Sequence, residues 1–463
     1  MHALRRLWVA TTSRAHGKRL TNPIQVVESR PVINELPDEL LQKVFSAYAD
    51  TFGFNSCARM LAIVRLGHVC RRWKSTLFDH HVIWSSIFID SPTNRTVGIL
   101  DLFLKNSASY PLYLVVFLKD EKELENRNQI IDEILKHTHR WKTICLSLFG
   151  RPYKPLCEIT PGSLPQLRFI TLFPWGWDQH YLDSFWSNVC HTKHTELTYV
   201  VWAGLKRVPL HAPWHQLRGV SLNSIVSLSE LLHILPQCQS CTSLSLFKLL
   251  PGEEESCSPA STMTISLPAL LSLEMGELNG VDITPLVESL HVPNLSELKT
   301  HFLSDQYRQS LLQMLIRSQS KLEKLSIKRK RCSLDEPHTL ALLKSPACQT
   351  VTRLSLDMEI PDEVMKALAS RDDGHVALLP GLNELNCSGS SFTDGLLSDI
   401  LKSRLPFLKA HADGSPAFSL TVRCSPRTHP IDKMFITKAQ ADGLIAFEEP
   451  VLDHGRTLVS RLR

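Results

Sequence analysis

The residues of this sequence whose types could support chemistry are thiols and imidazoles, and few of them are spaced for it. Cys238-x-x-Cys241 is the closest pair among the 12 cysteines. A structural zinc site needs a second such pair or a nearby His-x3–5-His segment, and neither accompanies this pair. His191 and His194 lie three residues apart, but no carboxylate pattern joins them. We therefore expect no metal site and no cofactor.

The motifs of the common enzyme classes are also missing from the sequence. It has no Gly-x-Ser-x-Gly nucleophile turn, no Gly-rich loop of the kind that cradles phosphate and no His-Glu-x-x-His pair. Several cysteines, such as Cys70, Cys145 and Cys387, fall within apolar patterns, where thiols behave as small buried hydrophobic groups. No catalytic residue is predicted, and the chain is expected to act by binding rather than as an enzyme.

The composition is that of a folded protein with no case for binding nucleic acid or membrane. Hydrophobic residues make up 43% of the 463 positions and charged residues 21%, so packed cores are expected. The formal net charge of +5 is small for this length. No apolar run reaches the ~18 residues that a membrane-spanning helix requires. The scattered cysteines fit a reducing compartment, and we expect a location in the cytoplasm, the nucleus or both.

Residues 33–48 predict an amphipathic helix. Pro37 suits the first turn, where its missing N–H is no loss, and two acidic residues follow at the positive end of the helix dipole. Apolar residues then recur on one helical face. This face consists of Leu40, Leu41, Val44, Phe45 and Tyr48.

A second helix is predicted across residues 61–77. Its apolar face consists of Leu61, Val64, Val69, Trp73 and Leu77, with Leu66 and Cys70 beside them. Two such helices bury too little apolar surface to form a stable core by themselves. We therefore expect some of their apolar side chains to be exposed and to bind a partner.

The order of motifs in this region resembles the F-box, a helical module that docks proteins onto the Skp-type adaptor of cullin–RING ubiquitin ligases. Leu36-Pro37 opens the first helix, and Val69-Cys70-Arg71-Arg72-Trp73 stands in the second. Ile83-Trp84 follows where the family usually has Leu-Trp. The series is similar to that of F-box proteins of the fungal type. The connector at about residues 49–59 is longer than usual and leaves the start of the second helix open.

The resemblance implies contact with a Skp-type adaptor and, through it, with a cullin. The residues expected in the adaptor contact are Leu36, Pro37, Leu40, Leu41, Val44, Phe45, Val69, Cys70, Trp73 and Trp84. Because a few buried side chains carry much of the energy of such interfaces, Trp73 and Leu41 are the first candidates for it. Trp73 could equally serve the core of the module, and the whole segment could be an ordinary pair of core helices.

Beyond residue 140 one short pattern recurs, with apolar residues at its first, fourth and sixth positions. Its ten occurrences begin at Trp141, Leu167, Leu197, Leu217, Cys241, Leu270, Leu295, Leu322, Val351 and Leu382. They begin 20 to 31 residues apart, about 27 on average, which is typical of leucine-rich repeats. Amphipathic segments between them, such as residues 228–235, 307–316 and 362–369, predict helices.

The predicted fold class is therefore α/β, with an N-terminal helical F-box followed by a leucine-rich-repeat-like solenoid of short parallel strands and helices. The uneven spacing and the lack of the Asn or Cys position that regular repeats carry predict an irregular solenoid. We expect a basic tail at residues 1–30, the F-box at 31–90, the solenoid at 91–410 and a C-terminal cap at 411–463. The tail could also be read as an Arg-rich mitochondrial transit peptide. In the last segment, residues 417–423 predict a strand and residues 431–447 a helix.

Alternation along each predicted strand sends one set of side chains under the helices and the other set onto the opposite, concave face. The residues of that face proposed to contact a protein substrate are Phe169, Tyr199, Asn223, Lys299, Lys324, Lys328, Arg353 and Asn386. A basic run from Lys321 to Arg331 could receive a phosphorylated or acidic segment, or it could be a solvated loop. The aromatic run from Phe173 to Trp186 could be a binding patch or part of the core.

Two functions of different classes follow from this layout. The first is the substrate-recognition subunit of a cullin–RING ubiquitin ligase, which binds a Skp-type adaptor through the F-box and a protein of unknown identity through the repeats. The second is an interaction scaffold outside any ligase, in which the N-terminal helices only cap the open end of the solenoid. The sequence specifies neither the substrate nor whether phosphorylation controls its binding.

Overall fold

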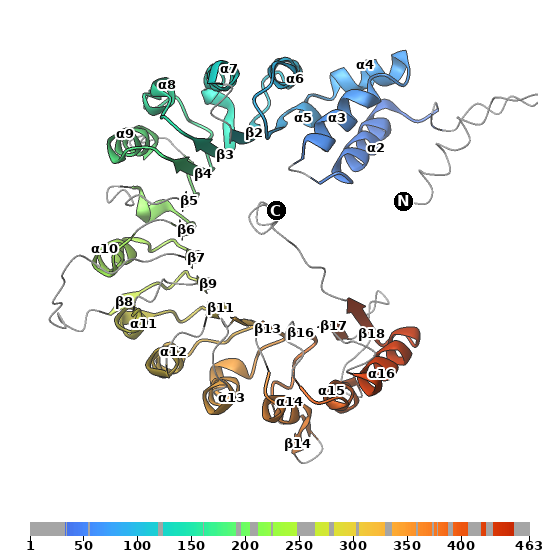
Figure 1. Cartoon of the computed structure of the whole chain (residues 1–463), viewed down its shortest axis with the longest axis vertical. Coiled ribbons are helices and arrows are strands. Elements are labelled where there is room, and N and C mark those ends of the chain that lie inside the picture. Colours follow the sequence, from blue (N-terminus) through green and yellow to red (C-terminus); the bar gives the residue numbers. More distant parts are fainter. Residues whose placement is uncertain are drawn as a thin grey trace, which may run out of the picture.

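The computed structural model is a curved array in which short parallel strands line the inner side and helices cover the outer side (Figure 1). It describes residues 33, 35–53, 56–118, 124–160, 162–190, 196–203, 212–223, 226–247, 264–276, 282–301, 305–328, 336–357, 360–372, 375–376, 378–387, 392–405, 418–422 and 429–448. The predictions for residues 1–30, for His191 and His194, and for the end of the basic run at 329–331 lie outside the described residues.

The N-terminal end of the array is helical. Its helices are α2 (Asp38–Asp50), α3 (Cys57–Leu66), α4 (Arg71–Asp79) and α5 (His81–Trp84). The single helix predicted across residues 61–77 is wrong, because the chain leaves α3 at Gly67 and starts α4 at Arg71. The Cys70 thiol accepts a hydrogen bond from the backbone N–H of Trp73 and so caps the new helix. The apolar pattern therefore spans two helices that share one core.

Within the described residues, fourteen strands form one sheet in which every neighbouring pair is parallel. They are β1 (Ser86–Ile89), β2 (Leu112–Leu118), β3 (Trp141–Phe149), β4 (Phe169–Trp175), β5 (Tyr199–Ala203), β6 (Gly219–Asn223), β7 (Ser243–Leu246), β9 (Ser272–Met275), β11 (Glu297–His301), β12 (Lys324–Lys328), β13 (Arg353–Asp357), β16 (Glu384–Cys387), β17 (Phe418–Val422) and β18 (Ile445–Glu448). Two short pairs, β8 (Ile265–Ser266) with β10 (Leu290–His291) and β14 (Arg371–Asp372) with β15 (His375–Val376), lie outside it. The strands follow one another in chain order, as a solenoid requires.

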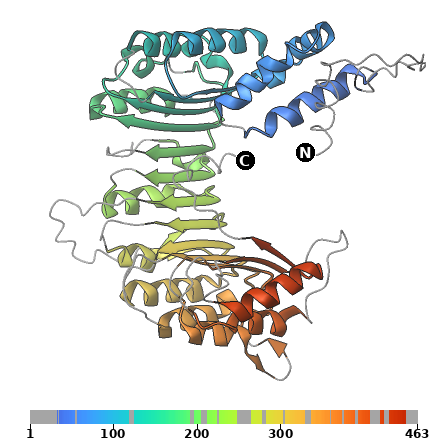
Figure 2. The same ribbon diagram turned by 45° about the vertical axis from the view of Figure 1, so that its right-hand side comes forward.

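The outer side carries the remaining helices. They are α6 (Asn94–Asn106), α7 (Leu124–Leu135), α8 (Lys154–Cys157), α9 (Gln179–Cys190), α10 (Leu228–Ile234), α11 (Thr284–Ser289), α12 (Asp305–Ser318), α13 (Glu336–Lys344), α14 (Asp362–Ala369), α15 (Leu396–Arg404) and α16 (Pro430–Ala441). Single turns of 3-10 helix stand before strands or after helices at Thr138–Arg140, Trp214–Gln216, Leu235–Gln237 and Pro346–Cys348. The α/β solenoid predicted from the sequence is thus present, and Figure 2 shows its strands stacked in one direction.

The structure also differs from the sequence predictions at both ends of the sheet. Each of the ten predicted repeats overlaps one strand between β3 and β16, but β1 and β2 precede them. β17 lies where a strand was predicted at residues 417–423. The helix predicted for residues 431–447 ends at Ala441, because Gly443 turns the chain with a φ of 71°, and the residues after it form β18.

One continuous core runs along the array, from Leu41 in α2 to Ile445 in β18. Each strand contributes alternate apolar side chains to it, as Leu325 and Ile327 of β12 do. Backbone hydrogen bonds also join neighbouring units at the start of most strands of the large sheet. The carbonyl of Ser296, for example, accepts the N–H groups of Glu323 at 2.8 Å and Lys324 at 3.0 Å. Stacking of units therefore supplies both the apolar and the polar contacts that no single unit makes alone.

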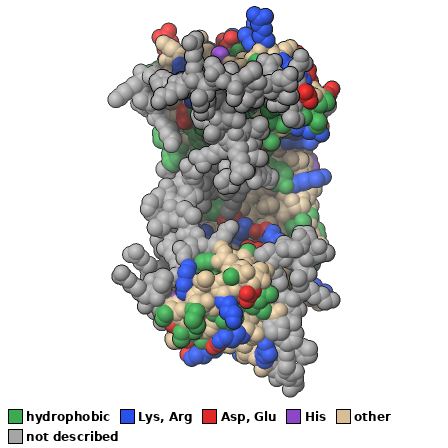
Figure 3. All heavy atoms as spheres, turned by 90° about the vertical axis from the view of Figure 1, so that its right-hand side faces the viewer, with side chains coloured by type: hydrophobic (Ala, Val, Ile, Leu, Met, Phe, Trp, Pro, Cys, Tyr) green, Lys and Arg blue, Asp and Glu red, His purple; other side chains and the backbone are tan. Residues whose placement is uncertain are grey.

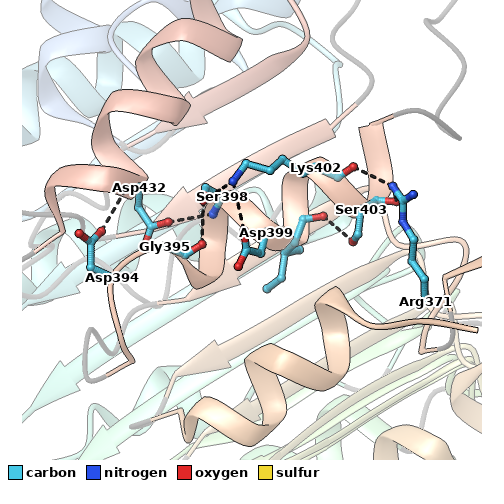
Figure 4. A network of polar contacts seen from close by, with 9 residues as sticks. Arg371, Asp394, Gly395, Ser398, Asp399, Lys402, Ser403 and Asp432 are labelled. Carbon is cyan, nitrogen blue, oxygen red and sulfur yellow. Dashed lines mark hydrogen bonds and ion pairs between the residues drawn. The ribbon is translucent and has the colours of Figure 1, made fainter.

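Polar side chains connect the last units of the array (Figure 4). The Asp394 carboxylate accepts the N–H groups of Ile431 and Asp432 at the start of α16, each at 3.0 Å. Asp432 in turn accepts the N–H of Ser398 in the first turn of α15, at 2.8 Å. Each carboxylate therefore satisfies N–H groups at the start of a helix and lies at the positive end of its dipole.

A buried arginine holds the units before them together. Arg404, which is 2% exposed, donates hydrogen bonds to the carbonyl oxygens of Leu368, Leu378 and Leu379 at 2.7–2.8 Å. Burial lowers the pKa of its guanidinium to about 10. The side chain stays charged at neutral pH and pairs backbone oxygens that would otherwise be buried without a donor.

Candidate docking surfaces

Helix α2 divides its apolar residues between two faces. Pro37 precedes the helix, and Asp38 and Glu39 occupy its first turn, as the sequence predicts. Leu41, Phe45 and Ala49 are completely buried against the other helices. The burial of this face fixes α2 on the module and leaves the other face of the helix toward solvent.

The solvent-facing side of α2 carries an apolar row that we call the α2 stripe, consisting of Leu40, Val44 and Tyr48 of the helix and Phe52 in the turn that follows it. The four-residue spacing places these side chains one above another. Leu40 is 45% exposed and Phe52 37%, whereas Val44 and Tyr48 are half-buried. The rings of Tyr48 and Phe52 lie edge to face with centroids 5.2 Å apart. Exposed apolar rows of this kind mark interaction sites on folded proteins.

The start of α4 lies beside the start of α2. The Arg72 guanidinium forms an ion pair of 2.7 Å with the Asp38 carboxylate and donates to the carbonyl oxygen of Leu36. Val69, in the turn before α4, is 58% exposed, and Cys70 is also exposed. The Leu-Pro and Val-Cys-Arg-Arg-Trp segments are thus held at one end of the module, next to the α2 stripe.

The structure separates the residues predicted to contact an adaptor into two groups. Pro37, Leu40, Val69 and Cys70 are exposed, and Leu36, Val44 and Trp73 are half-buried. Leu41, Phe45 and Trp84 are each at most 1% exposed and belong to the core of the chain itself. The Trp84 indole donates to the carbonyl of Leu77 at 2.8 Å, and the Trp73 ring packs against Phe45 at 5.1 Å. The second group therefore supports the surface that the first group presents.

Helix α3 attaches this module to the sheet. The backbone N–H of Phe88 in β1 lies 3.2 Å from the Met60 sulfur, and the Cys57 thiol lies 3.8 Å from the Phe88 carbonyl oxygen. The Trp84 ring packs against Phe103 of α6 at 4.9 Å. Because α3 covers the edge of β1, the module also caps the first strand of the solenoid.

The concave face changes character along the array. Its first strands carry aromatic side chains, including Phe169 and Tyr199 with ring centroids 6.4 Å apart. Its later strands carry charged side chains, including Lys299, Lys324 and Arg353. The registers place all the predicted substrate residues on this face, Asn223, Lys328 and Asn386 among them. The view into the open side shows Lys or Arg and Asp or Glu side chains together in the hollow (Figure 3).

The charged part of the concave face is arranged in pairs. Lys299 lies 2.5 Å from the Glu297 carboxylate, Lys324 lies 4.0 Å from it, and Arg353 lies 3.4 Å from Glu384. Burial acts to raise the pKa of Glu297, but the hydrogen bond and charge of Lys299, together with the charge of Lys324, outweigh it, so the pKa lies below its usual range. Carboxylate and cation hold each other in the charged state.

The cysteine pair considered for chemistry lies in the core, whereas His191 and His194 are outside the described residues. Cys238 and Cys241 are buried, and burial raises the pKa values of their thiols to about 12 and about 11. In the part of the chain that the structure covers, no group of three or more His, Cys, Asp or Glu residues is placed to hold a metal ion. The aromatic run that begins at Phe173 divides, with Trp177, Phe185 and Trp186 in the core and Trp175 on the concave side.

The comparison with protein families agrees with the position of the helical module. Residues 33–90 match the F-box-like family model. The chain carries an F-box-like domain. This domain comprises α2 to α5 and ends in β1, the first strand of the sheet. No curated protein matches the chain significantly. Among the described residues, no helix has the length and apolar character needed to cross a membrane.

Proposed function

We propose that this protein is the substrate-recognition subunit of a cullin–RING ubiquitin ligase. The F-box-like domain docks on a Skp-type adaptor, which connects it to a cullin, and the concave face of the solenoid holds a protein substrate. The observation that carries the proposal is the α2 stripe, an exposed apolar row within residues 33–90 next to the fixed start of α4. The role is non-catalytic, since ubiquitin is transferred by other subunits of such a ligase.

The burial of individual residues refines the proposed adaptor contact. We assign direct contact to Leu36, Pro37, Leu40, Val44, Val69 and Cys70, and a supporting role to Leu41, Phe45 and Trp84. Trp73 stands between the groups, since its ring is half-buried on Phe45. A partner that covers the exposed group removes apolar surface from water without disturbing the core.

The test is co-purification of the full chain with a Skp-type adaptor. A Leu40→Glu/Val69→Glu variant places two charges on the proposed contact at positions that are 45% and 58% exposed, so it is expected to fold and to lose the adaptor. Ile316→Glu is the matched control, because Ile316 is 46% exposed on α12 at a distant part of the array. Undiminished adaptor binding by the folded double variant would refute the docking surface.

A second candidate function rests on the contact between α3 and β1. That contact caps the sheet edge, as terminal units of solenoids do, and a cap needs no adaptor. The protein would then be an interaction scaffold outside any ligase. The scaffold predicts no binding of the parent chain to any Skp-type adaptor, and that result separates the two functions.

A further inference from the structure

The concave face of the first five strands carries an apolar cluster of its own, distinct from the core under the helices. Val115 of β2, Cys145 of β3, Phe173 of β4 and Ala203 of β5 form it, and Phe88 and Phe117 pack against it. The Phe88 and Phe117 rings lie edge to face at 5.8 Å. A sheet that faced only water on this side would alternate apolar and polar residues, so apolar residues on both faces indicate a second surface to be covered.

Aromatic side chains flank this cluster at both ends of the strands. Phe149 and Trp175 are register partners in β3 and β4, and their rings stack 5.3 Å apart with planes 15° from parallel. Tyr199 lies at the opposite end, and both Trp175 and Tyr199 are 40% exposed. Rigid aromatic side chains with free faces are the groups that anchor protein interfaces.

A glycine keeps one of these rings in place. A Cβ atom at Gly219 would lie 1.9 Å from Cδ1 of Tyr199, which shows that the tyrosine ring spreads across the backbone of β6. The exposed face of the ring therefore continues the apolar surface toward the middle of the array.

Among the described residues of β9 to β16, the charged half of the same face is electrically balanced. Four carboxylates, Glu274, Glu297, Asp357 and Glu384, share it with four cations, Lys299, Lys324, Lys328 and Arg353, and ion pairs join Lys299 and Lys324 to Glu297 and Arg353 to Glu384. A phosphate group bound here would compete with carboxylates that already pair with the cations and would be repelled by them. A partner complementary to the charged half of the concave face is therefore either uncharged or carries both positive and negative side chains. A partner with a cluster of charges of one sign does not match it.

We propose that the concave face selects an unphosphorylated, extended protein segment whose aromatic or large aliphatic side chains pack between Phe149–Trp175 and Tyr199, while its polar remainder runs along β11 to β16. This substrate class rests on the proposed function, because it describes what the recognition subunit holds. The apolar half supplies the anchor, and the balanced half excludes segments with dense negative charge. Electrostatic complementarity of this kind sets specificity more than affinity.

The experiment uses the full chain bound to its Skp-type adaptor and a library of short fluorescent synthetic peptides. One position of each peptide is fixed in turn to every amino acid, and phosphoserine and phosphothreonine are included. Trp175→Ala and Tyr199→Ser remove the two exposed rings, and Gly219→Ala keeps Tyr199 but forces its ring aside. Ile316→Ala is the matched control, because its side chain is exposed to a similar degree on the outer helix α12.

The proposal expects peptides fixed to aromatic or large aliphatic residues to be selected, with no gain from phosphate. It expects each ring deletion to weaken the selected peptides about tenfold, Gly219→Ala to weaken them less, and the control to leave them unchanged. Selection of phosphorylated or acidic peptides, or binding that the ring deletions do not change, would overturn it. Adaptor capture, measured in the same samples, reports on the proposed function separately, since the rings lie outside the α2 stripe.

Discussion

Adjacent leucines in α2 provide a direct test of the division between core and surface. Leu41 is completely buried, whereas Leu40 is 45% exposed on the α2 stripe. Leu41→Ala is therefore expected to act on stability and Leu40→Ala on adaptor binding. The two variants remove the same atoms from neighbouring positions, so each serves as the control for the other.

The expected magnitudes follow from the burial of each side chain. Leu41→Ala leaves a cavity in a packed core and is expected to lower the free energy of unfolding by about 2–5 kcal/mol. Leu40→Ala is expected to change it by roughly 0.5 kcal/mol or less. An adaptor that covers the exposed part of Leu40 gains about 1 kcal/mol from it, so Leu40→Ala should weaken the complex roughly three- to tenfold.

Urea unfolding followed by circular dichroism measures stability, and biolayer interferometry with immobilised Skp-type adaptor measures affinity. Binding is compared well below the unfolding midpoint of the weaker variant, so that unfolded protein does not lower the apparent affinity. The opposite pattern, in which Leu41→Ala weakens the complex with unchanged stability and Leu40→Ala binds like the parent chain, would refute the assigned faces of α2.

Three further predictions concern stability. Arg404→Leu is expected to lower the free energy of unfolding by about 3 kcal/mol, because three buried carbonyl oxygens lose their donor, and urea unfolding measures the change. Burial, and to a lesser degree the charge of His81, lowers the pKa of His80, whose ring is hydrogen-bonded to Ser46. As the pH falls below about 6.5, His80 therefore binds a proton in the unfolded chain before it does so in the folded protein. The free energy of unfolding should decrease in this range. His80→Gln should flatten that dependence in thermal melts between about pH 7 and pH 5, and an unchanged slope would contradict the assignment. Burial acts to raise the pKa of Asp394, but the hydrogen bonds from the N–H groups of Asp432 and Ile431 outweigh it, so the pKa is lowered. Asp394→Asn should therefore destabilise the C-terminal units near pH 7. The difference from the parent chain should disappear in acid, below the unfolded pKa of about 4, where the carboxylate becomes protonated.

The sequence predicts the solenoid well where only one face of each strand is apolar. From β6 to β16 the first, fourth and sixth positions of the pattern mark the buried side chains, and small, polar or charged residues alternate with them. In β2, however, the run Leu112–Leu118 is apolar throughout, because Val115 and Phe117 belong to the concave cluster. The register of β2 with β3 also shifts between Leu112 and Tyr113, so the buried residues Leu112, Leu114 and Val116 do not have the spacing of the repeat, and β2 is not recognisable from the pattern.

The candidate docking residues were predicted as a set but not by their faces. Leu40 and Leu41 are one position apart, and the sequence alone does not say which of them meets the other helices. The break between α3 and α4 was missed for a related reason, since its cap is a cysteine thiol, which is not among the side chains that usually begin helices. Such details depend on tertiary contacts that no local pattern encodes.

Helix α3 contacts β1, and a single residue, Ser85, separates the last of the F-box-like helices from that strand. In the proposed ligase, the distance from the adaptor to a bound substrate would therefore depend on the length of the continuous sheet between the F-box-like domain and the strands that hold the substrate. The strands of the concave face that bind the substrate would then determine which of its lysines receives ubiquitin.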